Sequence, residues 1–538
     1  MELLLNKEAS NNPMWLSLAL DELRIFGHVR QLTSKINSFP PGLIEMEENI
    51  LERFEKETEA DLIVGTLCLL ECSNSGLLES ELLKLLAKPG LIPVELESIC
   101  KCSERTNHRQ NERIPAVIWA DVYRLLRPFL RPFGPSGEGG LNFYHRTLSE
   151  VIRSRYFSKS DKISTHFFKI LSQFFKNIEE VSFERRLQEY PHACFGAGDR
   201  HGLLNFIQDW DVFDEFYNEQ FSPELSRYWS LVDQLEEKKE PSELSGVFLA
   251  MQNFYVHESQ RLLVLDKDIK TVSSRLEQIS RVLMQNRLCD VALGIANELV
   301  KITAKNCEDA TNDDIIRHAD GLFLKGSILD EDLRIDDYLF RTHQNTGSVQ
   351  EILTKLLETV DTLQGAISIY ITHAPNNPKL GKCFHIIAFN YASISRRGGI
   401  GDITAEKSRQ MAQLHIEKAI IIYEKLEDSL NQADCLITKA VCEIQNTSDE
   451  LENYQKALNL IVERYGNFHI LLLRVYFNIA IYYQDTNNQE QAEKWFQKWY
   501  QLHYDVLGKQ HPRTQNASKF IGRRRNTSEL CPQSDFNK

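Results

Sequence analysis

The feature that most constrains this chain is a repeated pattern near its C-terminal end. Residues 507–511 (LGKQH) echo residues 465–469 (YGNFH) at a distance of 42 residues, and residues 477–480 (FNIA) echo residues 389–392 (FNYA). Self-similarity of this kind is typical of folds that stack one small unit many times. Gly (25) and Pro (16) are few in the 538 residues, and apolar residues mostly recur at helical spacing, so we expect each unit to be a pair of helices.

These helix pairs resemble tetratricopeptide (TPR) repeats. In that family the first helix combines large residues with one small residue where the helices approach closely. The last unit has matching residues at Tyr476, Ile479, Ala480 and Tyr483. In its second helix Ala492 and Phe496 match, but Trp499 replaces the last small residue, which indicates an altered final interface. The ending at residues 507–514 resembles the long repeats of kinesin light chains.

Three further units are predicted upstream. The clearest has small and large residues in place on two helices, with an insertion at residues 396–399 starting the turn between them: Ala388, Tyr391, Ala392, Ala412, Ile416 and Ala419. A degenerate unit spans residues 272–302, and a weak one lies near residues 431–464. Any one apolar set would also fit an ordinary helical core, but four sets in register favour a solenoid with a groove for a partner.

The N-terminal half has a different pattern. Helical spacing of apolar residues recurs in residues 43–54, 63–70, 78–85 and 118–125, and residues 73–76 (SNSG) form a turn. A hairpin is then predicted, with arms at residues 129–133 and 141–145 and a glycine-rich turn between them. Another helix begins at Leu148 and reaches Tyr156. Helices followed by one β-hairpin are typical of a winged helix.

Three segments of this half resemble, in order, motifs of STAND-type (NACHT-like) P-loop NTPases. They are residues 12–27 (NPMWL and LDELRIFG), residues 141–146 (LNFYHR) and residues 185–192 (RRLQEYPH). The resemblance implies a helical lid, a winged helix and the start of a helical region, and it is strongest to nephrocystin-like proteins, which join such an NTPase to a TPR tail.

A P-loop itself is missing from the sequence. The motif requires GxxxxGK followed by Ser or Thr, and neither Gly381-Lys382 nor Gly508-Lys509 has the preceding Gly or the following hydroxyl residue. We therefore expect the nucleotide-binding core to lie upstream of Met1, and the chain to be the C-terminal part of such a protein.

The predicted fold is mainly α: a winged-helix-like N-terminal region followed by an α-solenoid of TPR-like helix pairs. Residues 97–113 and 306–314 are polar and aperiodic, so we expect exposed loops there. The predicted domains are a remnant of the NTPase lid with a linker helix (1–60), a winged-helix-like domain (61–157), a helical repeat region (158–271), a degenerate TPR-like solenoid (272–506), and a last-repeat extension with a disordered tail (507–538).

Charge, apolar runs and cysteine content indicate the cellular compartment of such a chain. The formal net charge is −14, and no uncharged apolar run approaches the roughly 20 residues that a membrane helix needs. The first residues lack the basic and apolar regions of a signal peptide. Eleven scattered cysteines fit a reducing compartment better than a disulfide framework. We expect a cytoplasmic protein that binds neither membrane nor nucleic acid.

Two groups of residues have side chains of the kind that bind metals, and each also has a simpler interpretation. Cys100, Cys102 and His108 could suggest a metal site, but zinc is normally held by four ligands in spaced pairs, so a flexible surface loop is favoured. Cys68 and Cys72 lie one helical turn apart among leucines, which favours buried core thiols.

Two features of the predicted winged helix have both a functional and a structural interpretation. His145 lies where some STAND proteins place a phosphate-contacting His, but a structural His is favoured because the other half of that site is absent. Six arginines put basic charge around the winged helix, yet no compact basic recognition helix is evident, so a solvated face is favoured over DNA binding. They are Arg124, Arg127, Arg131, Arg146, Arg153 and Arg155.

These patterns predict a non-enzymatic interaction scaffold that binds a protein or peptide in its TPR groove, with no catalytic residue, cofactor or metal. The candidate partner-binding residues are Asn390 and Asn478, which occupy matching places in the two FNxA copies. In TPR repeats an Asn on the first helix often hydrogen-bonds a peptide backbone; the alternative is chance reuse of a solvent-facing position. Two alternative functions stay open: a regulatory fragment of an ATP-hydrolysing STAND switch, or a truncated product with no independent role.

Overall fold

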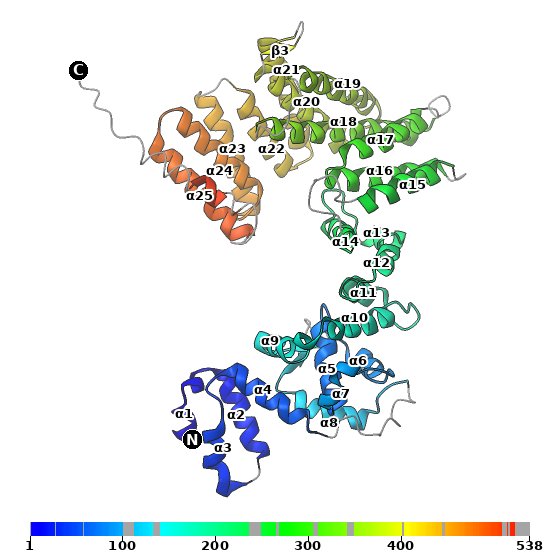
Figure 1. The fold of residues 1–538 in the computed structure, drawn as a ribbon. Helices are drawn as coiled ribbons and strands as arrows, with labels where there is room; N and C mark the ends of the chain where they lie inside the picture. The colour runs from blue at the N-terminus through cyan, green and yellow to red at the C-terminus, as the bar shows by residue number, and fades with distance from the viewer. Residues whose placement is uncertain are drawn as a thin grey trace, which may run out of the picture. The chain divides into compact units, whose positions relative to one another are not determined.

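A computed structural model describes residues 2–26, 28–57, 59–100, 112–132, 140–235, 249–264, 268–304, 310–341, 349–396, 398–400, 403–443, 447–507, 514 and 517–521. Helices dominate these residues (Figure 1), which confirms the mainly α prediction. The chain divides into two compact units. Unit 1 comprises Met1–Asn218 and Ser222–Met251, and unit 2 comprises Glu219–Phe221 and Gln252–Lys538. The bounds of the five predicted domains stay a prediction.

Unit 1 begins with four α-helices, and the second carries the buried Trp15. They are α1 (Glu2–Leu5), α2 (Pro13–Ile25), α3 (Leu32–Ser38) and α4 (Leu43–Phe54). The Asn12 side chain caps α2 by accepting hydrogen bonds from the backbone N–H groups of Met14 (2.9 Å) and Trp15 (3.3 Å). Pro13 occupies the first helical turn, where its missing N–H costs nothing. Trp15 is fully buried and donates from Nε1 to the carbonyl of Pro40 (3.2 Å), so the NPMWL segment both starts the helix and anchors it.

The next elements have the order predicted for a winged helix. They are α5 (Ala60–Cys72), α6 (Glu79–Leu86), α7 (Val94–Cys100), α8 (Ala116–Leu126), β1 (Leu130–Pro132), β2 (Leu141–Phe143) and α9 (Arg146–Arg155). Strands β1 and β2 pair antiparallel with Leu130 opposite Phe143, which agrees with the predicted hairpin arms. Leu77, just before α6, forms an isolated antiparallel bridge with Leu141, so the hairpin is attached to the helix-turn-helix.

Three local predictions in this region need correction or lie outside the described residues. The buried face of α8 is Trp119, Val122 and Leu126, one position away from the Ile118 and Leu125 expected from spacing. Residues 97–100 belong to α7 rather than to a loop, since the helix runs from Val94 to Cys100. Residues 101–111, including Cys102 and His108, and the hairpin turn at residues 133–139 lie outside the described part of the chain.

Short helices complete unit 1: α10 (Asp161–Phe175), α11 (Phe183–Ala197), α12 (Arg200–Ile207), α13 (Trp210–Phe216) and α14 (Pro223–Gln234). The RRLQEYPH segment lies on α11 and forms hydrogen bonds with the turn between α5 and α6 and with the first turn of α6. Arg185 donates to Glu81 from Nε and Nη2 (both 2.8 Å) and to the carbonyl of Gly76 (2.8 Å). Glu189 accepts from the backbone N–H groups of Asn74 and Ser75, both at 2.8 Å. These contacts use the charges of the motif to fix a helix against a loop.

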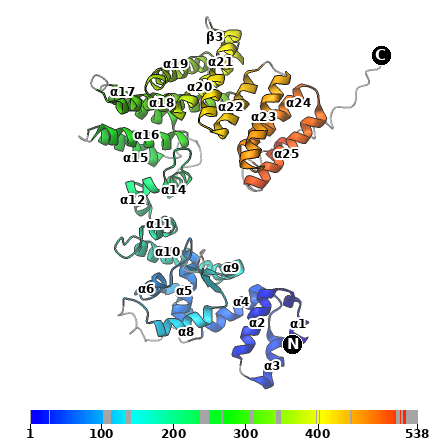
Figure 2. The same cartoon turned by 180° about the vertical axis from the view of Figure 1, so that it is seen from behind.

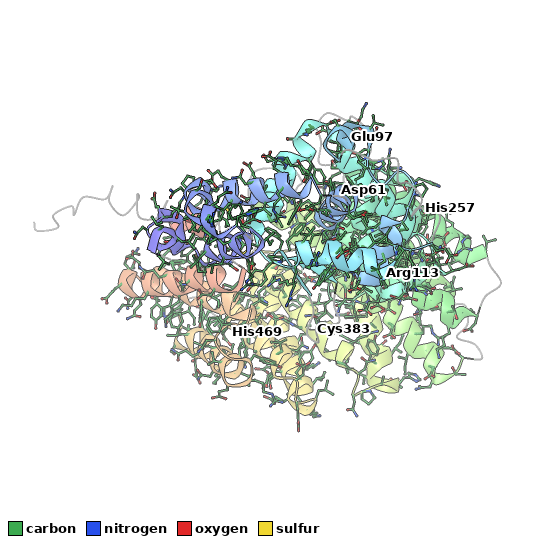
Figure 3. All side chains as sticks on the ribbon, turned by 90° about the horizontal axis from the view of Figure 1, so that it is seen from below. Asp61, Glu97, Arg113, His257, Cys383 and His469 are labelled. Atoms are coloured by element: carbon green, nitrogen blue, oxygen red, sulfur yellow. The ribbon has the colours of Figure 1, made fainter. Side chains whose placement is uncertain are left out.

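Unit 2 is a succession of antiparallel helices, each packed on the next (Figures 1 and 2). After α15 (Leu249–Val264), whose residues from Gln252 belong to this unit, they are α16 (Ile269–Gln285), α17 (Cys289–Ala304), α18 (Asn312–Arg341), α19 (Val349–His373), α20 (Pro378–Arg396), α21 (Ala405–Lys425), α22 (Ser429–Cys442), α23 (Ser448–Tyr465), α24 (Leu471–Asp485) and α25 (Gln489–Leu507). The thiol of Cys383 on α20, labelled in Figure 3, is fully buried.

The predicted repeat positions lie at the helix contacts. The small residues of both complete predicted units are fully buried or nearly so: Ala388, Ala392, Ala412, Ala419, Ala480 and Ala492. The degenerate unit is α16 with α17, where Leu276, Ile279 and Ala296 are also buried. The insertion after α20 forms a small hairpin of β3 (Gly399–Ile400) and β4 (Ile403–Thr404) before α21 begins. The solenoid prediction is therefore confirmed.

One helix pair in the solenoid was not predicted. Residues 312–314, expected to be part of an acidic loop, begin the long helix α18, which packs on α19. Its close-approach residue is Gly326, where an added Cβ would lie 2.4 Å from Leu363 of α19. This pair has Gly where the other units have Ala, so the repeat pattern built on Ala does not predict it. The tail at residues 522–538 lies outside the described residues.

Three helix–helix turns share one backbone geometry. Arg287, Glu427 and Asn487 all have positive φ, at 63°, 55° and 58°. In each turn the backbone N–H of the following residue donates to the carbonyl five residues earlier: Leu288 to Leu283 (3.0 Å), Asp428 to Tyr423 (3.0 Å) and Asn488 to Tyr483 (2.8 Å). This is the pattern of a Schellman helix end. The repeats therefore share a turn as well as a packing pattern.

Candidate functional site

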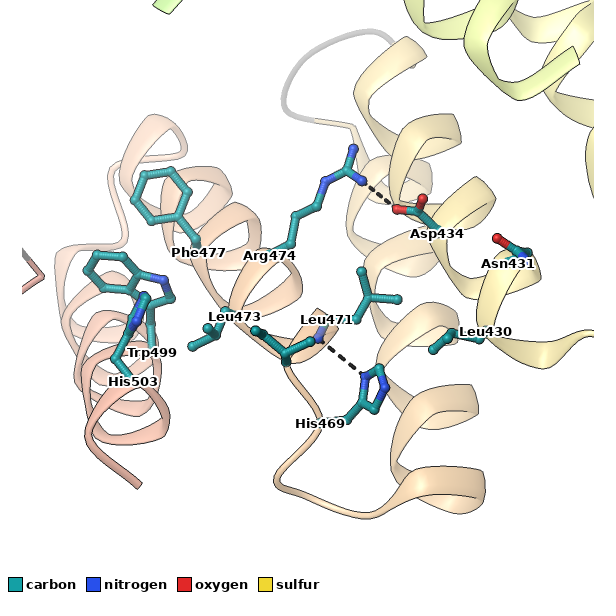
Figure 4. Close-up of a pocket in the computed structure, with 11 residues that line it drawn as sticks. Leu430, Asn431, Asp434, His469, Leu471, Leu473, Arg474, Phe477, Trp499 and His503 are labelled. Carbon is teal, nitrogen blue, oxygen red and sulfur yellow. Dashed lines mark hydrogen bonds and ion pairs between the residues drawn. The ribbon is translucent and has the colours of Figure 1, made fainter. Parts of the chain in front are cut away.

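A cavity of about 650 Å³ lies within the C-terminal repeats of unit 2. Figure 4 shows that its walls come from α22, from α24 with the segment before it, and from α25. We call it the repeat cavity. It is lined by Leu430, Asn431, Asp434, His469, Ile470, Leu471, Leu473, Arg474, Phe477, Trp499 and His503.

Helical spacing brings the lining residues together. On α24, Leu473 and Phe477 are four residues apart and so lie on one face, as Trp499 and His503 do on α25. Before α24, the Leu471 backbone N–H donates to Nδ1 of His469 (3.3 Å), which holds this imidazole at the cavity wall. Ile470 is 48% exposed although it lines the cavity, so an apolar side chain stands open to solvent at the rim.

The repeat cavity has an aromatic side and a charged side (Figure 4). On the aromatic side, Phe477 and Trp499 have ring centroids 5.2 Å apart, and His503 meets Trp499 edge-on at 4.8 Å. On the charged side, Arg474 forms an ion pair with Asp434, and His385 lies 3.8 Å from the same carboxylate. The arrangement suits an apolar side chain together with polar groups on a peptide, because aromatic walls bury apolar area while guanidinium and carboxylate orient hydrogen bonds.

Among the described residues that line the repeat cavity there is no Ser, Thr, Cys or Lys, and the one carboxylate, that of Asp434, is paired with Arg474. Within the described ranges, no group of three or more His, Cys, Asp or Glu side chains could hold a metal ion.

The two predicted partner-binding residues lie in different environments. Asn390 on α20 is only 1% exposed, and its Nδ2 has no hydrogen-bond partner among the described residues. Asn478 on α24 is half-buried and follows Phe477 in the chain. Neither lines the repeat cavity, and the structure does not bring them together in one site. Their role in partner binding stays a prediction.

Other candidates from the sequence are tied into unit 1. Nδ1 of His145 lies 3.1 Å from the Thr147 hydroxyl, which donates to the buried carboxylate of Glu47 (2.9 Å). Cys68 and Cys72 are buried, as expected, and burial raises the pKa of Cys72. Two of the winged-helix arginines form ion pairs across the unit, Arg155 with Glu55 (2.6 Å) and Arg153 with Glu71.

Sequence reasoning missed most of the repeat cavity. Trp499 carried a signal, because it departs from the small residue that a TPR unit places there, and His469 and Phe477 lie in the two repeated segments. Asp434, Arg474 and His503 are ordinary surface residue types in a helical pattern, and only their meeting in space distinguishes them.

The comparison with protein families points to the same part of the chain. A family model described as tetratricopeptide repeat matches residues 451–503, which cover most of α23, all of α24 and most of α25. In the described part of the chain, no helix has the length and apolar character needed to cross a membrane.

Three curated proteins are similar to parts of the chain. A TPR repeat-containing protein of Dictyostelium discoideum is 22% identical over 231 residues, which are 42% of this chain and 12% of that protein. Telomerase protein component 1 of Mus musculus is 33% identical over 235 residues, 42% of this chain and 9% of that protein. Tetratricopeptide repeat protein 41 of Mus musculus is 25% identical over 191 residues, 32% of this chain and 13% of that protein. The matched segments therefore span about a tenth of each relative's own length, and two of the three relatives are named as TPR proteins.

Proposed function

We propose that this chain is a non-enzymatic scaffold of the cytoplasm that binds a peptide segment of another protein in the repeat cavity. The observation that carries the proposal is the cavity itself. It combines aromatic walls, an exposed Ile470 and an Arg474–Asp434 ion pair within the residues matched by the TPR model or beside them. A volume of about 650 Å³ fits within the size range of ligand sites in proteins.

The charge pattern supports a peptide over a small apolar molecule. A peptide brings backbone N–H and C=O groups into the site, and these need partners when they lose water. Asp434, Arg474, His469 and Asn431 offer such partners along one side of the cavity. An apolar side chain of the same peptide would then be buried against Phe477 and Trp499, as in interface hot spots.

The test uses the full chain and a displayed peptide library. Peptides enriched on the native protein are labelled, and their Kd is measured by fluorescence anisotropy against two matched variants. Ile470→Asp places a carboxylate at the rim of the cavity, and Phe468→Asp places one two residues earlier, on a 68% exposed side chain that does not line it. We expect Ile470→Asp to weaken binding by about tenfold or more, and Phe468→Asp to leave it nearly unchanged. Equal affinity of Ile470→Asp and the native protein would exclude the cavity as the site.

The resemblance to STAND NTPases supports a second proposal, in which unit 1 is the lid and winged-helix arm of an ATP-hydrolysing switch. In its favour, the segments that carry the resemblance have specific structural contacts: Asn12 and Trp15 at α2, and Arg185 and Glu189 on α11. Calorimetry with ATP and magnesium tests whether this chain itself binds nucleotide. The scaffold proposal expects no binding, and micromolar magnesium-dependent binding by this chain would replace it with the switch.

A further inference from the structure

A second cavity, of about 460 Å³, lies inside unit 1 and is independent of the repeat cavity. It is bounded by α2, α4, the end of α8 and the residues that lead into β1. Its floor is apolar and buried: Leu18, Ile50, Phe54 and Phe129. Ile25, which also lines it, is 60% exposed, so apolar surface reaches from the floor to solvent. We call this feature the arginine groove.

Four guanidinium groups line the arginine groove against two carboxylates. The cations are Arg24, Arg53, Arg124 and Arg127, and the anions are Asp21 and Glu22. They come from segments far apart in the sequence, so the excess of positive charge arises only where folding brings the end of α8 to the same cavity as α2 and α4.

These cations are only weakly engaged inside the molecule. Arg24 pairs with Asp21 (3.0 Å) and Arg124 with Asp121 (3.3 Å), but both arginine side chains are largely exposed, and exposed pairs of this kind are worth about 0–1 kcal/mol. Arg127 is exposed and its side chain has no ion pair with any residue that the structure describes. Arg53 is held more firmly, by Glu22 at 2.8 Å, with its guanidinium over the Phe54 ring. Arg124 and Arg127 are therefore available to an incoming anion.

We propose that the arginine groove is a docking surface for an acidic peptide segment of a partner protein that also carries an apolar anchor residue. Guanidinium groups bind carboxylates through paired hydrogen bonds, so Asp or Glu side chains complement Arg124 and Arg127. The anchor residue fills the apolar cavity beside Ile25 and Phe129. This partner surface is additional to the proposed peptide site in the repeats and does not depend on it.

Nucleic acid fits the groove less well than an acidic peptide. A phosphate backbone is bound by cations spread along a surface, whereas an apolar floor between the cations gives it nothing to contact. Other arginines of the winged helix are already used within unit 1, as the Arg155–Glu55 and Arg153–Glu71 pairs illustrate. The groove thus favours carboxylates next to an apolar side chain.

The probe is a short fluorescein-labelled peptide in which Glu alternates with Leu around one Phe, titrated with the full chain and followed by anisotropy. The substitution Arg124→Ala with Arg127→Ala removes two exposed rim cations, so the fold should be unaffected. The matched control is Arg146→Ala, a 92% exposed arginine on α9 that does not line the groove. We expect saturable binding by the native protein, a loss of about tenfold in the double variant and no change in Arg146→Ala.

Three outcomes overturn the proposal. They are no saturable binding of the acidic peptide, an equal loss in Arg146→Ala, or equally tight binding of the same peptide with Leu and Phe replaced by Gly, which would remove the apolar anchor. A DNA duplex that binds the native protein more tightly than the peptide and is released by the same double substitution would assign the groove to nucleic acid instead. Ile470→Asp should leave probe binding unchanged, which separates failure here from failure of the repeat cavity.

Discussion

Glu47 on α4 is a buried carboxyl group whose surroundings disfavour its charge. Desolvation raises its pKa from 4.5 to about 7; the hydrogen bond from Thr147 partly offsets the rise, and the negative charge of Glu150 adds to it. Its Oε2 has no hydrogen-bond partner among the described residues. The folded protein therefore holds this proton more tightly than the unfolded chain does. The contribution of Glu47 to stability is most favourable below about pH 4.5, declines as pH rises, and is lost above about pH 7.

Replacing Glu47 by Gln should remove this pH dependence. We expect the free energy of unfolding of Glu47→Gln, relative to the native protein, to rise by about 1 to 3 kcal/mol between pH 4.5 and pH 8, because Gln never carries the buried charge. Urea unfolding followed by tryptophan fluorescence at several pH values measures the difference. Glu48→Gln, the neighbouring position on the same helix, is the control and should keep the native profile. A native profile in Glu47→Gln would show that the carboxylate is better solvated than its burial indicates.

The burial of Asn390 and the partial exposure of Asn478 give their substitutions different expected effects. Asn478 does not line the repeat cavity, so its predicted hydrogen bond requires a peptide that extends beyond the cavity along α24. For such a peptide, Asn478→Ala should weaken binding by about 0.5–1.5 kcal/mol, the net value of one hydrogen bond, and leave the melting temperature nearly unchanged. Asn390→Ala should act mainly on the melting temperature, because its amide is inside the α20 packing. Anisotropy and thermal unfolding on the same variants separate the two effects. Unchanged peptide affinity in the double variant would remove both residues from the site.

At the scale of elements, the shared turn explains how helices of different composition keep one repeat geometry. A non-glycine residue with positive φ costs about 1–2 kcal/mol, and Asn tolerates it better than charged residues do. The backbone strain is therefore larger at Arg287 and Glu427 than at Asn487.

Glycine at these turns should therefore have unequal effects. Glu427→Gly should stabilise the protein by about 0.5–1 kcal/mol, since the relief of strain exceeds the added freedom of the unfolded chain. Asn487→Gly, the matched change in the equivalent turn, should alter stability by only a few tenths of a kcal/mol. Urea unfolding of both variants tests this. A destabilised Glu427→Gly would mean that the Glu side chain itself supports the turn.

Close packing between helices limits what the repeat positions accept. Ala480 is fully buried in a cluster with Ala492 and Phe496, so Ala480→Trp should overpack the α24–α25 contact and cost about 1–3 kcal/mol or more. Gln484→Trp, on an exposed position of the same helix, should cost little. Circular dichroism during thermal unfolding measures both. Equal melting temperatures would contradict the close approach of these helices.

At the scale of the whole molecule, the chain has two compact units with separate cores. In a repeat array each helix pair contacts mainly its neighbours, so a local defect should stay local. Trp15 is the anchor of the first helices of unit 1, fully buried and hydrogen-bonded to Pro40.

Loss of that anchor should be felt in unit 1 alone. Trp15→Ala should destabilise unit 1 by about 3–5 kcal/mol, and hydrogen exchange should accelerate in α2 to α4 while protection of α16 to α25 stays unchanged. Mass spectrometry of peptic fragments reports both units in one experiment. An equal loss of protection in unit 2 would show that the two units unfold as one.

The helical class, the hairpin after α8 and the repeat positions could be predicted from the sequence, because they depend on local periodicity. Ala388, Ala480 and Ala492 could be assigned to helix contacts from spacing alone, since only a small residue fits where two backbones approach. Asn12 and Pro13 likewise carry the start of α2 in their own chemistry.

Features that depend on residues distant in the chain could not be predicted and became visible in the folded protein. The pairing of Arg474 with Asp434 crosses 40 residues, and the arginine groove joins Arg24 and Arg53 to Arg124 and Arg127. From the sequence alone, a charged residue on a helix is predicted to face solvent. Its ion-pair partner on a second helix is known only once the two helices are packed together. Gly326 shows the same limit for packing, because its close contact with Leu363 exists only once α18 and α19 lie side by side. Local spacing therefore specified the elements and many of their buried positions, whereas the cavities arise from contacts between helices that no local pattern encodes.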